Sequence, residues 1–479
     1  MFAPAASAQC VDEWVAVESG PAARQASIVV SSRVLGGVVL FGGYDQQSCN
    51  IVRFGDTWLW RESQGWQQMS FPNTPSAREG MMAAYDSARG KIVMFGGNTG
   101  VLSSETWELG EEGWVLRSVG GPSPREWGSM AFDSARGVCV LFGGNSASSG
   151  GLSDTWEWNG SAWTQRNVSG PSGRRGSAMA FDESRQRIVL FGGWVTFGVP
   201  LGDTWEWNGS VWQQFQGGVP PAAAYPGMCY DPDKQRVVLF AGAGPNVDRS
   251  DTWVRMGTNW SQLAPANAPA SRNYPGFTFD VVSRRILMFG GSIRNSTCRV
   301  PFGDTVLFTD RPVVTSSATN VTACMHGEVT LSVVVKGYGA PTYRWQYEQE
   351  PQVWIDTPEG AINFAGGTLQ ASGGTGPALY LQTDVQDDAE RVRFRCVVSN
   401  ACGDGVGAPI VLAPCQSDLT CDNVVDDEDF VVFAAAYNVL DCADPAMAAG
   451  CPADLNGDGL VDDGDFVEFV AAYNNLGCL

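Results

Sequence analysis

The chain has 479 residues, which exceeds one ordinary domain and predicts about three domains. Hydrophobic residues make up 44% and charged residues 17%, which excludes a disordered chain, and 58 glycines with 18 tryptophans favour an all-β, turn-rich fold. The net charge is −21, and residues 415–479 hold 14 acidic side chains with no Lys or Arg, which argues against a nucleic-acid partner. No stretch is apolar enough for a transmembrane segment.

The first residues and the cysteines point to export. Ala6-Ser7-Ala8 resembles the end of a secretory signal, so we expect residues 1–9 to be a signal-peptide remnant, with an ordinary frayed terminus as the alternative. The 13 cysteines include several at matching spacings, which predicts a disulfide framework. We therefore expect a protein that is secreted, extracellular or on the cell surface.

An internal repeat occupies about the first 310 residues. An apolar run that ends in Phe-Gly-Gly, or in Phe-Ala-Gly in the fifth copy, recurs six times. The residue after the phenylalanine is Gly42, Gly96, Gly143, Gly192, Ala241 and Gly290. The intervals are 54, 47, 49, 49 and 49 residues, a period typical of four-stranded propeller blades.

Each repeat has the same order of elements. A small-residue strand ends in Asp, as at Asp182, and an apolar strand such as 188–191 follows, which we expect to be buried on both faces. Next come Asp-Thr-Trp and a hairpin, where Asn159-Gly160 predicts a type I′ turn. The recurrent aspartates, which we expect to cap turns, are Asp56, Asp154, Asp203 and Asp251.

The sixth repeat lacks the tryptophan that ends the other five. Trp14 lies upstream of the first repeat, and Gly20-Pro21 follows it as Gly170-Pro171 follows Trp163. We therefore expect the N-terminal segment to supply the outer strand of the last blade, which closes the ring without open edges. The sequence predicts a six-bladed β-propeller over residues 10–311.

These six repeats resemble the kelch family, which is related in architecture to galactose oxidase. The resemblance implies a binding platform for proteins or glycans. The copper chemistry of that relative needs histidine ligands, but the chain has one histidine, His326, outside the repeats. A zinc site with several histidines and a Ser-His-Asp triad are disfavoured for the same reason, so we do not expect an enzyme. Carboxylate acid–base chemistry stays open as an alternative.

Five repeats carry an arginine eight residues before the end of the first strand, and the fifth repeat has Ala223 there. The five are Arg24, Arg78, Arg125, Arg174 and Arg272. By symmetry we expect them near one mouth of the central channel, where guanidinium groups bind acidic ligands in a bidentate way. Arginines at this position line the ligand face of characterised kelch propellers, so the resemblance implies the same role. The alternative is that each arginine pairs with an acid of a neighbouring blade.

Residues 312–414 follow a different pattern. Short strands are expected at 329–335, 343–347, 379–381, 393–400 and 408–412, which fits a β-sandwich of about 100 residues. The order Trp345, Phe394, Cys396 resembles bacterial immunoglobulin-like domains, although Val333 occupies the position of the first core cysteine. We expect Cys324 to pair with Cys396 or Cys402, and the sequence leaves both partners open. We expect a spacer rather than a recognition surface.

Residues 415–479 contain two copies of an acidic loop, 36 residues apart. The second copy places oxygen ligands at the EF-hand positions 1, 3, 5, 7, 9 and 12, with Gly459 at position 6. Its predicted calcium ligands are Asp454, Asn456, Asp458, the carbonyl of Leu460, Asp462 and Asp465. An amphipathic helix is expected at 466–473.

The first copy is a poorer calcium loop, because Thr420 occupies position 3 and Asn423 replaces the glycine. Its predicted ligands are Asp418, Thr420, Asp422, the carbonyl of Val424, Asp426 and Asp429. A second helix is expected at 430–437. Cys415 and Cys451, like Cys442 and Cys478, are 36 residues apart and predict two bridges within or between the copies, with Cys421 left over.

This duplicated loop and helix resemble type I dockerin domains, whose known partners are cohesins. The resemblance implies a calcium-dependent module of mainly α structure and a cohesin-like partner, although the basic residues typical of the family are missing. The alternative is a calcium-stabilised terminal cap without a partner.

Among the other cysteines, Cys139 and Cys229 are expected as buried thiols, and Cys49 and Cys298 as a staple between the first and last blades. Overall we expect a secreted modular binding or adhesion protein, with a glycan or protein ligand at the propeller and calcium in the tail. The alternatives are a carbohydrate-active enzyme or epimerase acting in the propeller mouth, and a purely structural surface protein.

Overall fold

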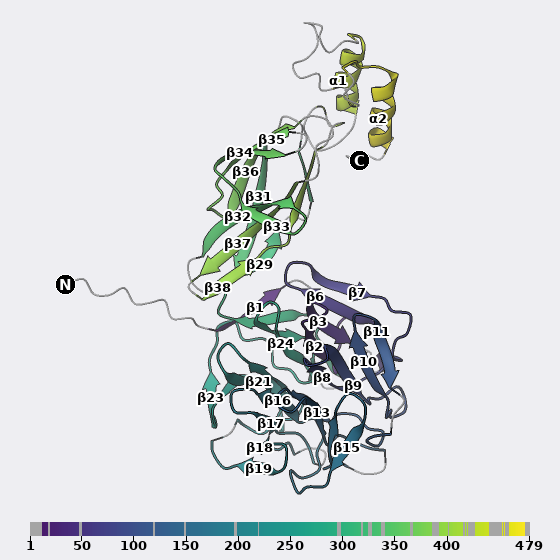
Figure 1. The fold of residues 1–479 in the computed structure, drawn as a ribbon, viewed down its shortest axis with the longest axis vertical. Coiled ribbons are helices and arrows are strands. Elements are labelled where there is room, and N and C mark those ends of the chain that lie inside the picture. Colours follow the sequence, from purple (N-terminus) through teal and green to yellow (C-terminus); the bar gives the residue numbers. More distant parts are fainter. Residues whose placement is uncertain are drawn as a thin grey trace, which may run out of the picture. The chain divides into compact units, whose positions relative to one another are not determined.

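A computed structural model of the chain describes residues 12–17, 20–46, 50–117, 120–147, 150–195, 199–218, 220–294, 298–317, 320–323, 328–336, 341–364, 367–385, 392–400, 402–414, 417, 419, 427–439, 453, 455 and 459–474. The fold is mainly β, with two helices in these ranges. The chain divides into two compact units, an N-terminal unit Val11–Asp310 and a C-terminal unit formed by Arg311–Leu479 with Met1–Cys10. Figure 1 draws the N-terminal unit in purple to teal and the helices of the C-terminal unit in yellow.

The N-terminal unit contains six four-stranded antiparallel sheets. The inner strands are β2 Ile28–Ser32, β8 Met82–Asp86, β12 Ser129–Asp133, β16 Ala178–Asp182, β20 Gly227–Asp231 and β24 Gly276–Asp280. The second strands are β3 Gly37–Phe41, β9 Lys91–Phe95, β13 Val138–Phe142, β17 Arg187–Phe191, β21 Arg236–Ala243 and β25 Arg285–Phe289. Each inner strand is an edge of its sheet and pairs only with the second strand.

The outer half of each sheet consists of a third and a fourth strand. The third strands are β6 Thr57–Arg61, β10 Thr106–Gly110, β14 Thr155–Trp158, β18 Thr204–Trp207, β22 Asp248–Met256 and β28 Thr305–Thr309. The fourth strands are β7 Gly65–Met69, β11 Gly113–Arg117, β15 Trp163–Arg166, β19 Trp212–Phe215, β23 Asn259–Leu263 and, from the N-terminal segment, β1 Glu13–Val17, which pairs with β28. Two small hairpins, β4 Tyr44–Asp45 with β5 Val52–Arg53 and β26 Ser292–Arg294 with β27 Arg299–Pro301, follow the second strands of the first and last sheets.

The six sheets pack in a closed, propeller-like cycle. The inner strands are neighbours in the order β2, β8, β12, β16, β20, β24 and back to β2. Residues 188–191 of β17 are all 0% exposed, as continuous apolar character predicts for a strand covered on both faces. Ile188 and Leu190 pack in one cluster with residues of β13, whereas Val189 and Phe191 pack in another with residues of β21.

The hairpin turn at Asn159-Gly160 differs from the expected type I′ turn. Gly160 has a φ of 95°, but Asn159 is not among the residues with positive φ. Trp158 pairs with Trp163, so the loop has four residues, and the Asn159 side-chain oxygen accepts hydrogen bonds from the backbone of Ser161 and Ala162. An asparagine that caps its own turn in this way does not need positive φ.

The C-terminal unit begins with two sheets that share one core. One sheet has the order β29 Val313–Ser317, β31 Glu328–Lys336, β36 Ala378–Val385, β35 Gly367–Ser372, β34 Gly360–Phe364. The other has the order β30 Asn320–Ala323, β39 Ile410–Pro414, β37 Val392–Asn400, β32 Thr342–Glu350, β33 Val353–Asp356, with β38 Gly403–Val406 beside β37. The core cluster combines residues of both sheets, such as Leu331 and Leu379 with Trp345 and Phe394.

Two helices follow, α1 Asp427–Tyr437 and α2 Asp463–Asn474, each beginning three residues before its expected start. Phe433, Phe469 and Val461 belong to their common core.

The described cysteines exclude one of the two expected disulfide partners of Cys324. Cys139, Cys229 and Cys396 are buried free thiols, and burial raises the pKa of all three. The pairing of Cys324 with Cys396 is therefore wrong, because the Cys396 thiol lies in the sandwich core. The cysteines outside the described residues are Cys10, Cys49, Cys324, Cys415, Cys421, Cys442, Cys451 and Cys478.

Candidate functional site

The arginines expected at the channel mouth are buried in the segments that precede the inner strands. Each of the five is at most 1% exposed. Arg174 shows the common geometry: its two terminal nitrogens donate to the Asp203 carboxylate at 2.6 and 2.9 Å, and one of them also donates to the Gly192 carbonyl at 3.1 Å. The acids of the other four pairs, Arg24–Asp56, Arg78–Glu105, Arg125–Asp154 and Arg272–Asp304, likewise belong to the same repeat.

These contacts correct the expectation of an accessible arginine ring, and also the alternative of pairing between blades. Burial alone would raise the pKa of Asp203, but the hydrogen bonds and charge of Arg174 outweigh burial and lower that pKa. The same carboxylate accepts a hydrogen bond from Trp205 Nε1 at 2.7 Å. Asp203 thus links the arginine, the glycine turn and the Asp-Thr-Trp strand of its own sheet.

In the fifth repeat, an arginine at a different position pairs with the aspartate. Asp251 pairs with Arg249, two residues before it, at 2.8 and 2.9 Å. The repeat pattern does not reveal this arginine, because Arg249 lies outside the position that the other five arginines share. An unpaired Asp followed by Trp in a repeat without the usual arginine is the signal that could have found it.

The mouth itself is built by six backbone hydrogen bonds in a closed circle. Its members, here called the axial ring, precede the inner strands and all have a φ between 55° and 66°: Ala26, Gly80, Trp127, Gly176, Tyr225 and Tyr274. Each N–H donates to the carbonyl of the ring member in the preceding sheet, and Ala26 N donates to Tyr274 O at 3.2 Å to close the circle. A non-glycine residue at such φ is strained, so the circle holds four residues in an unfavourable conformation.

Large and small side chains alternate around part of the axial ring. A Cβ on Gly80 would lie 3.1 Å from the Trp127 ring, and a Cβ on Gly176 would lie 2.4 Å from the Tyr225 ring. Tyr225 stacks on Tyr274 with centroids 4.0 Å apart, and Trp127 contacts both tyrosines edge-on at 5.3 and 4.9 Å. Trp194 completes the group at 5.3 Å from Tyr225. We call Trp127, Trp194, Tyr225 and Tyr274 the aromatic mouth.

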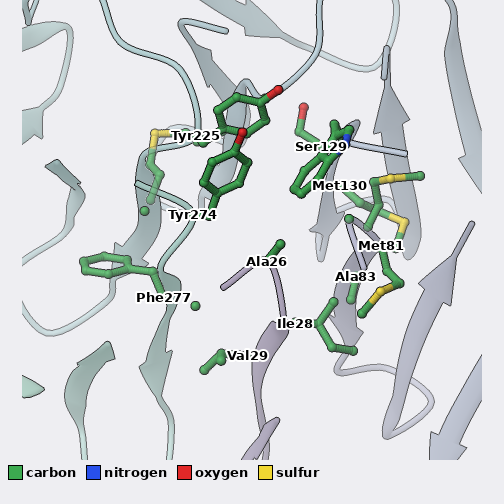
Figure 2. A pocket seen from close by; sticks show the side chains of 18 of the residues that line it. Ala26, Ile28, Val29, Met81, Ala83, Ser129, Met130, Tyr225, Tyr274 and Phe277 are labelled. Carbon is green, nitrogen blue, oxygen red and sulfur yellow. The ribbon is translucent and has the colours of Figure 1, made fainter. Parts of the chain in front are cut away.

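A cavity of about 200 Å³ extends from the aromatic mouth along the inner strands. All six inner strands contribute to its wall, together with side chains such as Met81, Met130 and Phe277. Figure 2 shows Tyr225 and Tyr274 side by side at one end of this space and Ile28, Val29 and Phe277 farther along it. Each inner strand is an edge of its sheet, so one side of its backbone has no neighbouring strand within that sheet.

Gly176→Ala tests the packing of the aromatic mouth. The added methyl group would overlap the Tyr225 ring, and the alanine backbone would have to keep a φ of 66°. We therefore expect a loss of about 1–3 kcal/mol in unfolding free energy. The measurement is chemical denaturation followed by tryptophan fluorescence. Gly218→Ala is the matched control, because nothing lies within 4 Å of its Cβ position. Equal stability of the two variants would contradict the described packing.

Charged side chains of both signs surround the aromatic mouth. Glu79 precedes Gly80 and is 4% exposed, and Arg53 of β5 contacts its carboxylate at 2.8 Å. Glu126 precedes Trp127, and its Cβ lies 3.3 Å from the Cβ position of Gly80. Arg299 lies over the Tyr274 ring at 4.8 Å. Charged groups of both signs therefore stand beside the aromatic rings, where Arg175 also interacts electrostatically with Tyr225 and Tyr274.

The Glu79 carboxyl is poised to change charge near neutral pH. Burial raises its pKa to about 7, Arg53 opposes that rise, and the charge of Glu126 adds to it. Burial also raises the pKa of the Tyr44 hydroxyl, on the hairpin that carries Arg53, and the neighbouring Tyr274 and Glu79 add to this rise.

This raised pKa predicts a pH dependence of stability. The Glu79 carboxyl binds its proton more tightly in the folded state than in the unfolded state, where its pKa is about 4.5. The protonated carboxyl therefore contributes to the free energy of unfolding, and this contribution is fully present below pH 4.5. It is lost as the pH rises from about 4.5 to about 7. Thermal melts at several pH values should therefore have a steeper decline over this range in the wild type than in Glu79→Gln. Identical profiles for the two proteins would argue against a protonated Glu79.

The predicted calcium ligands lie partly outside the described residues. Eight of the twelve are outside the described residues: Asp418, Thr420, Asp422, Val424, Asp426, Asp454, Asn456 and Asp458. Among the rest, Asp429 and Asp465 are 0% exposed, and the Asp465 carboxylate accepts hydrogen bonds from the backbone of Leu455 at 2.7 Å and Asp462 at 2.9 Å. Gly459 has the expected positive φ of 88°. Leu460, the expected carbonyl ligand, is 46% exposed at its side chain.

The donor chemistry of this loop fits a hard cation. Residues 415–479 contain no Lys or Arg, so no basic side chain of this segment can balance the two buried carboxylates. Within the described part of the segment no three His, Cys, Asp or Glu side chains come together, since ligands at positions 1, 3 and 5 are outside it. Completion of a site therefore depends on those loop residues.

No protein-family model matches the chain, and no curated protein sequence matches it significantly. Within the described ranges, neither helix has the length and apolar character needed to cross a membrane.

Proposed function

We propose that the chain is a secreted modular binding protein whose N-terminal unit is a six-bladed propeller of the kelch type and recognises a glycan or protein at the aromatic mouth. The observation that carries this proposal is that half-buried Trp127 and Tyr274 line the cavity, with Glu126 beside the axial ring at Gly80 and Arg299 over the Tyr274 ring. Aromatic faces beside a few polar groups are typical of ligand sites in concave surfaces. The proposed site is thus the aromatic mouth and not the five arginines that the sequence pattern favoured as ligand-binding residues.

A glycan and peptide array tests the ligand, with the full chain applied in the presence and absence of calcium. Trp127→Gly should lose at least tenfold in affinity for any ligand found, because truncating a central aromatic anchor has this scale of effect. Glycine suits the position, since the axial ring already contains Gly80 and Gly176 at the same φ. Val211→Ala, in the turn between β18 and β19, is the control. Binding that is unchanged in Trp127→Gly would reject the mouth as the site.

The second candidate is a carbohydrate-active enzyme or epimerase that uses the mouth carboxyl groups. It draws support from Glu79, whose pKa is raised by burial to about 7 with a further rise from the charge of Glu126. A carboxyl group that is protonated near neutral pH can act as a general acid. Turnover of an array-identified glycan by the wild type and its loss in Glu79→Gln would favour this candidate over simple binding.

We also propose that residues 312–414 are an immunoglobulin-like spacer. Two sheets that share one core around Trp345, in a segment of about 100 residues, support this assignment. Export is supported by Cys298 and Cys402, which are in the disulfide-bonded state. A shift in mobility on reducing gels of the full chain tests the bridges.

We propose that the tail is an EF-hand pair, similar to dockerin, that folds on calcium and attaches the protein to a cohesin-like partner. The loop spacing and the buried Asp429 and Asp465 support it. When bound, calcium would balance the loop carboxylates and draw its oxygen ligands together. Calcium bound per chain, measured by atomic absorption after dialysis, should fall by about one in Asp465→Ala, since one loop loses its position-12 ligand. Unchanged calcium in that variant would contradict the assignment.

A further inference from the structure

The loops that join the second and third strands differ in length around the propeller-like cycle. Asp56 lies 14 residues after Gly42 and Asp304 lies 14 residues after Gly290, whereas the corresponding spans of the other four repeats are 9 to 11 residues. The longer loops contain the hairpins β4–β5 and β26–β27, in the first and last sheets, whose inner strands are neighbours. Because four sheets join the cycle without such a hairpin, the two hairpins are available for a site.

Both hairpins begin at the aromatic mouth. Their first residues are Tyr44 and Ser292. Tyr44 forms a β-bridge with Gln25, and Ser292 forms one with Asn273. Gln25 and Asn273 directly precede two members of the axial ring, so the hairpins lie at the same end of the inner strands as that ring.

Each hairpin brings one arginine to the mouth. The Arg53 guanidinium contacts the Glu79 carboxylate at 2.8 Å. The half-buried Arg299 lies 4.8 Å from the centre of the Tyr274 ring, and its Nη1 donates to Asn273 Oδ1 at 2.6 Å. Arg299 has no carboxylate partner among the residues that the structure describes. Its charge and its remaining donors are therefore available to a ligand.

Asn273 adds an unused donor beside this arginine. Its side chain is 0% exposed, and its Oδ1 also accepts a hydrogen bond from Ser292 Oγ at 3.2 Å. Because a guanidinium only donates, the contact with Arg299 fixes this oxygen and leaves Nδ2 as the remaining donor. Neither Asn273 Nδ2 nor Gln25 Nε2 has an acceptor within the described part of the chain. Buried donors without an acceptor are costly, so we expect an oxygen atom from outside the protein here.

The charge at the mouth favours an anionic group. The charged side chains that act on the mouth tyrosines or on one another here are Glu79, Glu126, Arg53, Arg175 and Arg299. This group has more guanidinium than carboxyl groups, although the whole chain has a net charge of −21. A guanidinium pairs with a carboxylate through two parallel hydrogen bonds, so a carboxylate matches Arg299 in shape as well as in charge.

The aromatic side chain beside this site selects the kind of carboxylate. Trp127 is half-buried, and its ring lies 4.9 Å from the Tyr274 ring that Arg299 covers. A uronic acid residue combines a carboxylate with a pyranose ring whose C–H face packs on aromatic side chains. A peptide carboxylate would match Arg299 but would leave Trp127 without a partner. The combination therefore favours an acidic glycan over an acidic peptide.

We propose that the edge of the aromatic mouth beside the β26–β27 hairpin binds a uronic acid residue of an acidic glycan. Arg299 pairs with its carboxylate, and the side-chain amide of Asn273 donates to an oxygen of the same residue. This inference rests on the proposed binding role of the mouth and names the class of its ligand.

The test compares tetragalacturonate with its fully methyl-esterified form, which has the same rings and linkages but no charge. Isothermal titration of the full chain should give binding of the acid that is about tenfold tighter or more, because the ester cannot form the ion pair. Arg299→Gln keeps a donor for Asn273 but removes the charge, so it should bind the acid about tenfold more weakly or worse. Arg187→Gln is the matched control, since Arg187 begins β17 at the end opposite the mouth, and it should bind as the wild type does.

Arg299→Lys keeps the charge but loses the bidentate geometry, so its affinity should lie between those of the wild type and Arg299→Gln. Circular dichroism checks the fold of every variant. If Arg299→Gln does not fold, a wild-type affinity of Arg299→Lys overturns the proposal.

Three other results would also overturn the proposal. They are equal binding of the acid and the ester, absence of tetragalacturonate binding to the wild type, and unchanged binding in a folded Arg299→Gln protein. A tetraglutamate peptide that binds more tightly than tetragalacturonate, with the same dependence on Arg299, would replace the acidic glycan with an acidic protein.

Trp127→Gly separates this inference from the proposed function. A neutral array ligand that Trp127→Gly loses and Arg299→Gln retains would reject the carboxylate site and keep the aromatic mouth. Tetragalacturonate binding that depends on Arg299 but not on Trp127 would keep the carboxylate site and reject the aromatic mouth as the anchor.

Discussion

Trp14→Ala lowers the unfolding free energy of the N-terminal unit by about 3–5 kcal/mol, the usual cost of truncating a buried tryptophan. Trp14 is 1% exposed, and its ring lies 4.7 Å from Phe240 and 4.8 Å from Phe308. Its indole N–H donates to Thr252 Oγ1 at 3.2 Å, in the sheet before the one that β1 completes. The substitution therefore leaves a cavity between two sheets and an unpaired hydroxyl acceptor.

The effect should extend beyond the cavity, because β1 completes the last sheet by pairing with β28 and also donates from the Trp14 N–H to the Ala266 carbonyl at 3.1 Å. Asp12, just before β1, also contacts Lys234 at 2.5 Å and Arg236 at 2.8 Å. Loosening of β1 would expose the edge of β28, so aggregation should increase together with the loss of stability.

Urea denaturation of the full chain measures the change. Trp14→Phe is the conservative control and should lose less, since an aromatic ring still fills most of the space. Val211→Ala, at an exposed turn position, should be within about 0.5 kcal/mol of the wild type. A midpoint for Trp14→Ala that matches Val211→Ala would show that β1 does not close the cycle in solution.

Arg174→Met is expected to cost about 3 kcal/mol, at the lower end of the range for breaking a buried ion pair, because Asp203 keeps 21% of its side chain exposed. The change leaves the Asp203 carboxylate with Trp205 as its remaining side-chain partner and removes a donor from the Gly192 carbonyl. Both consequences act inside a single sheet, so the loss should not depend on any ligand.

The double variant Arg174→Met with Asp203→Leu separates the charge from the packing. It should recover part of the lost stability, because no uncompensated carboxylate remains. Thermal melts of the wild type, both single variants and the double variant form the cycle. An Arg174→Met protein that melts like the wild type yet loses an array-identified ligand would falsify the structural role assigned to this arginine.

Much of the fold follows from local pattern. The 49-residue period, the continuous apolar runs and the missing sixth tryptophan predict sheets of four strands and a β1 that joins the last of them. A run such as 188–191 is apolar at every position because both of its faces are covered, and that is visible in the sequence. The EF-hand spacing predicts both helices, although each begins three residues before its expected start, inside the predicted loop.

The candidate site depended on contacts that no local pattern contains. The shared position of five arginines predicted their equivalence, but whether a guanidinium faces solvent or an acid of its own sheet depends on residues 27–32 positions away. Arg249 fills the place of the missing sixth arginine from another position, which periodicity cannot reveal. The prediction of a type I′ turn was wrong for a related reason, because the Asn159 side chain offers the backbone a competing hydrogen bond.

By itself, the sequence determined the repeat, the strand order and the calcium-loop spacing, because each depends on residues close together in the chain. The tertiary structure alone decided that the arginines are internal and that the axial ring brings Trp127, Tyr225 and Tyr274 to one mouth. These residues are about 50 and 100 positions apart, and only the closed circle of backbone hydrogen bonds makes them neighbours.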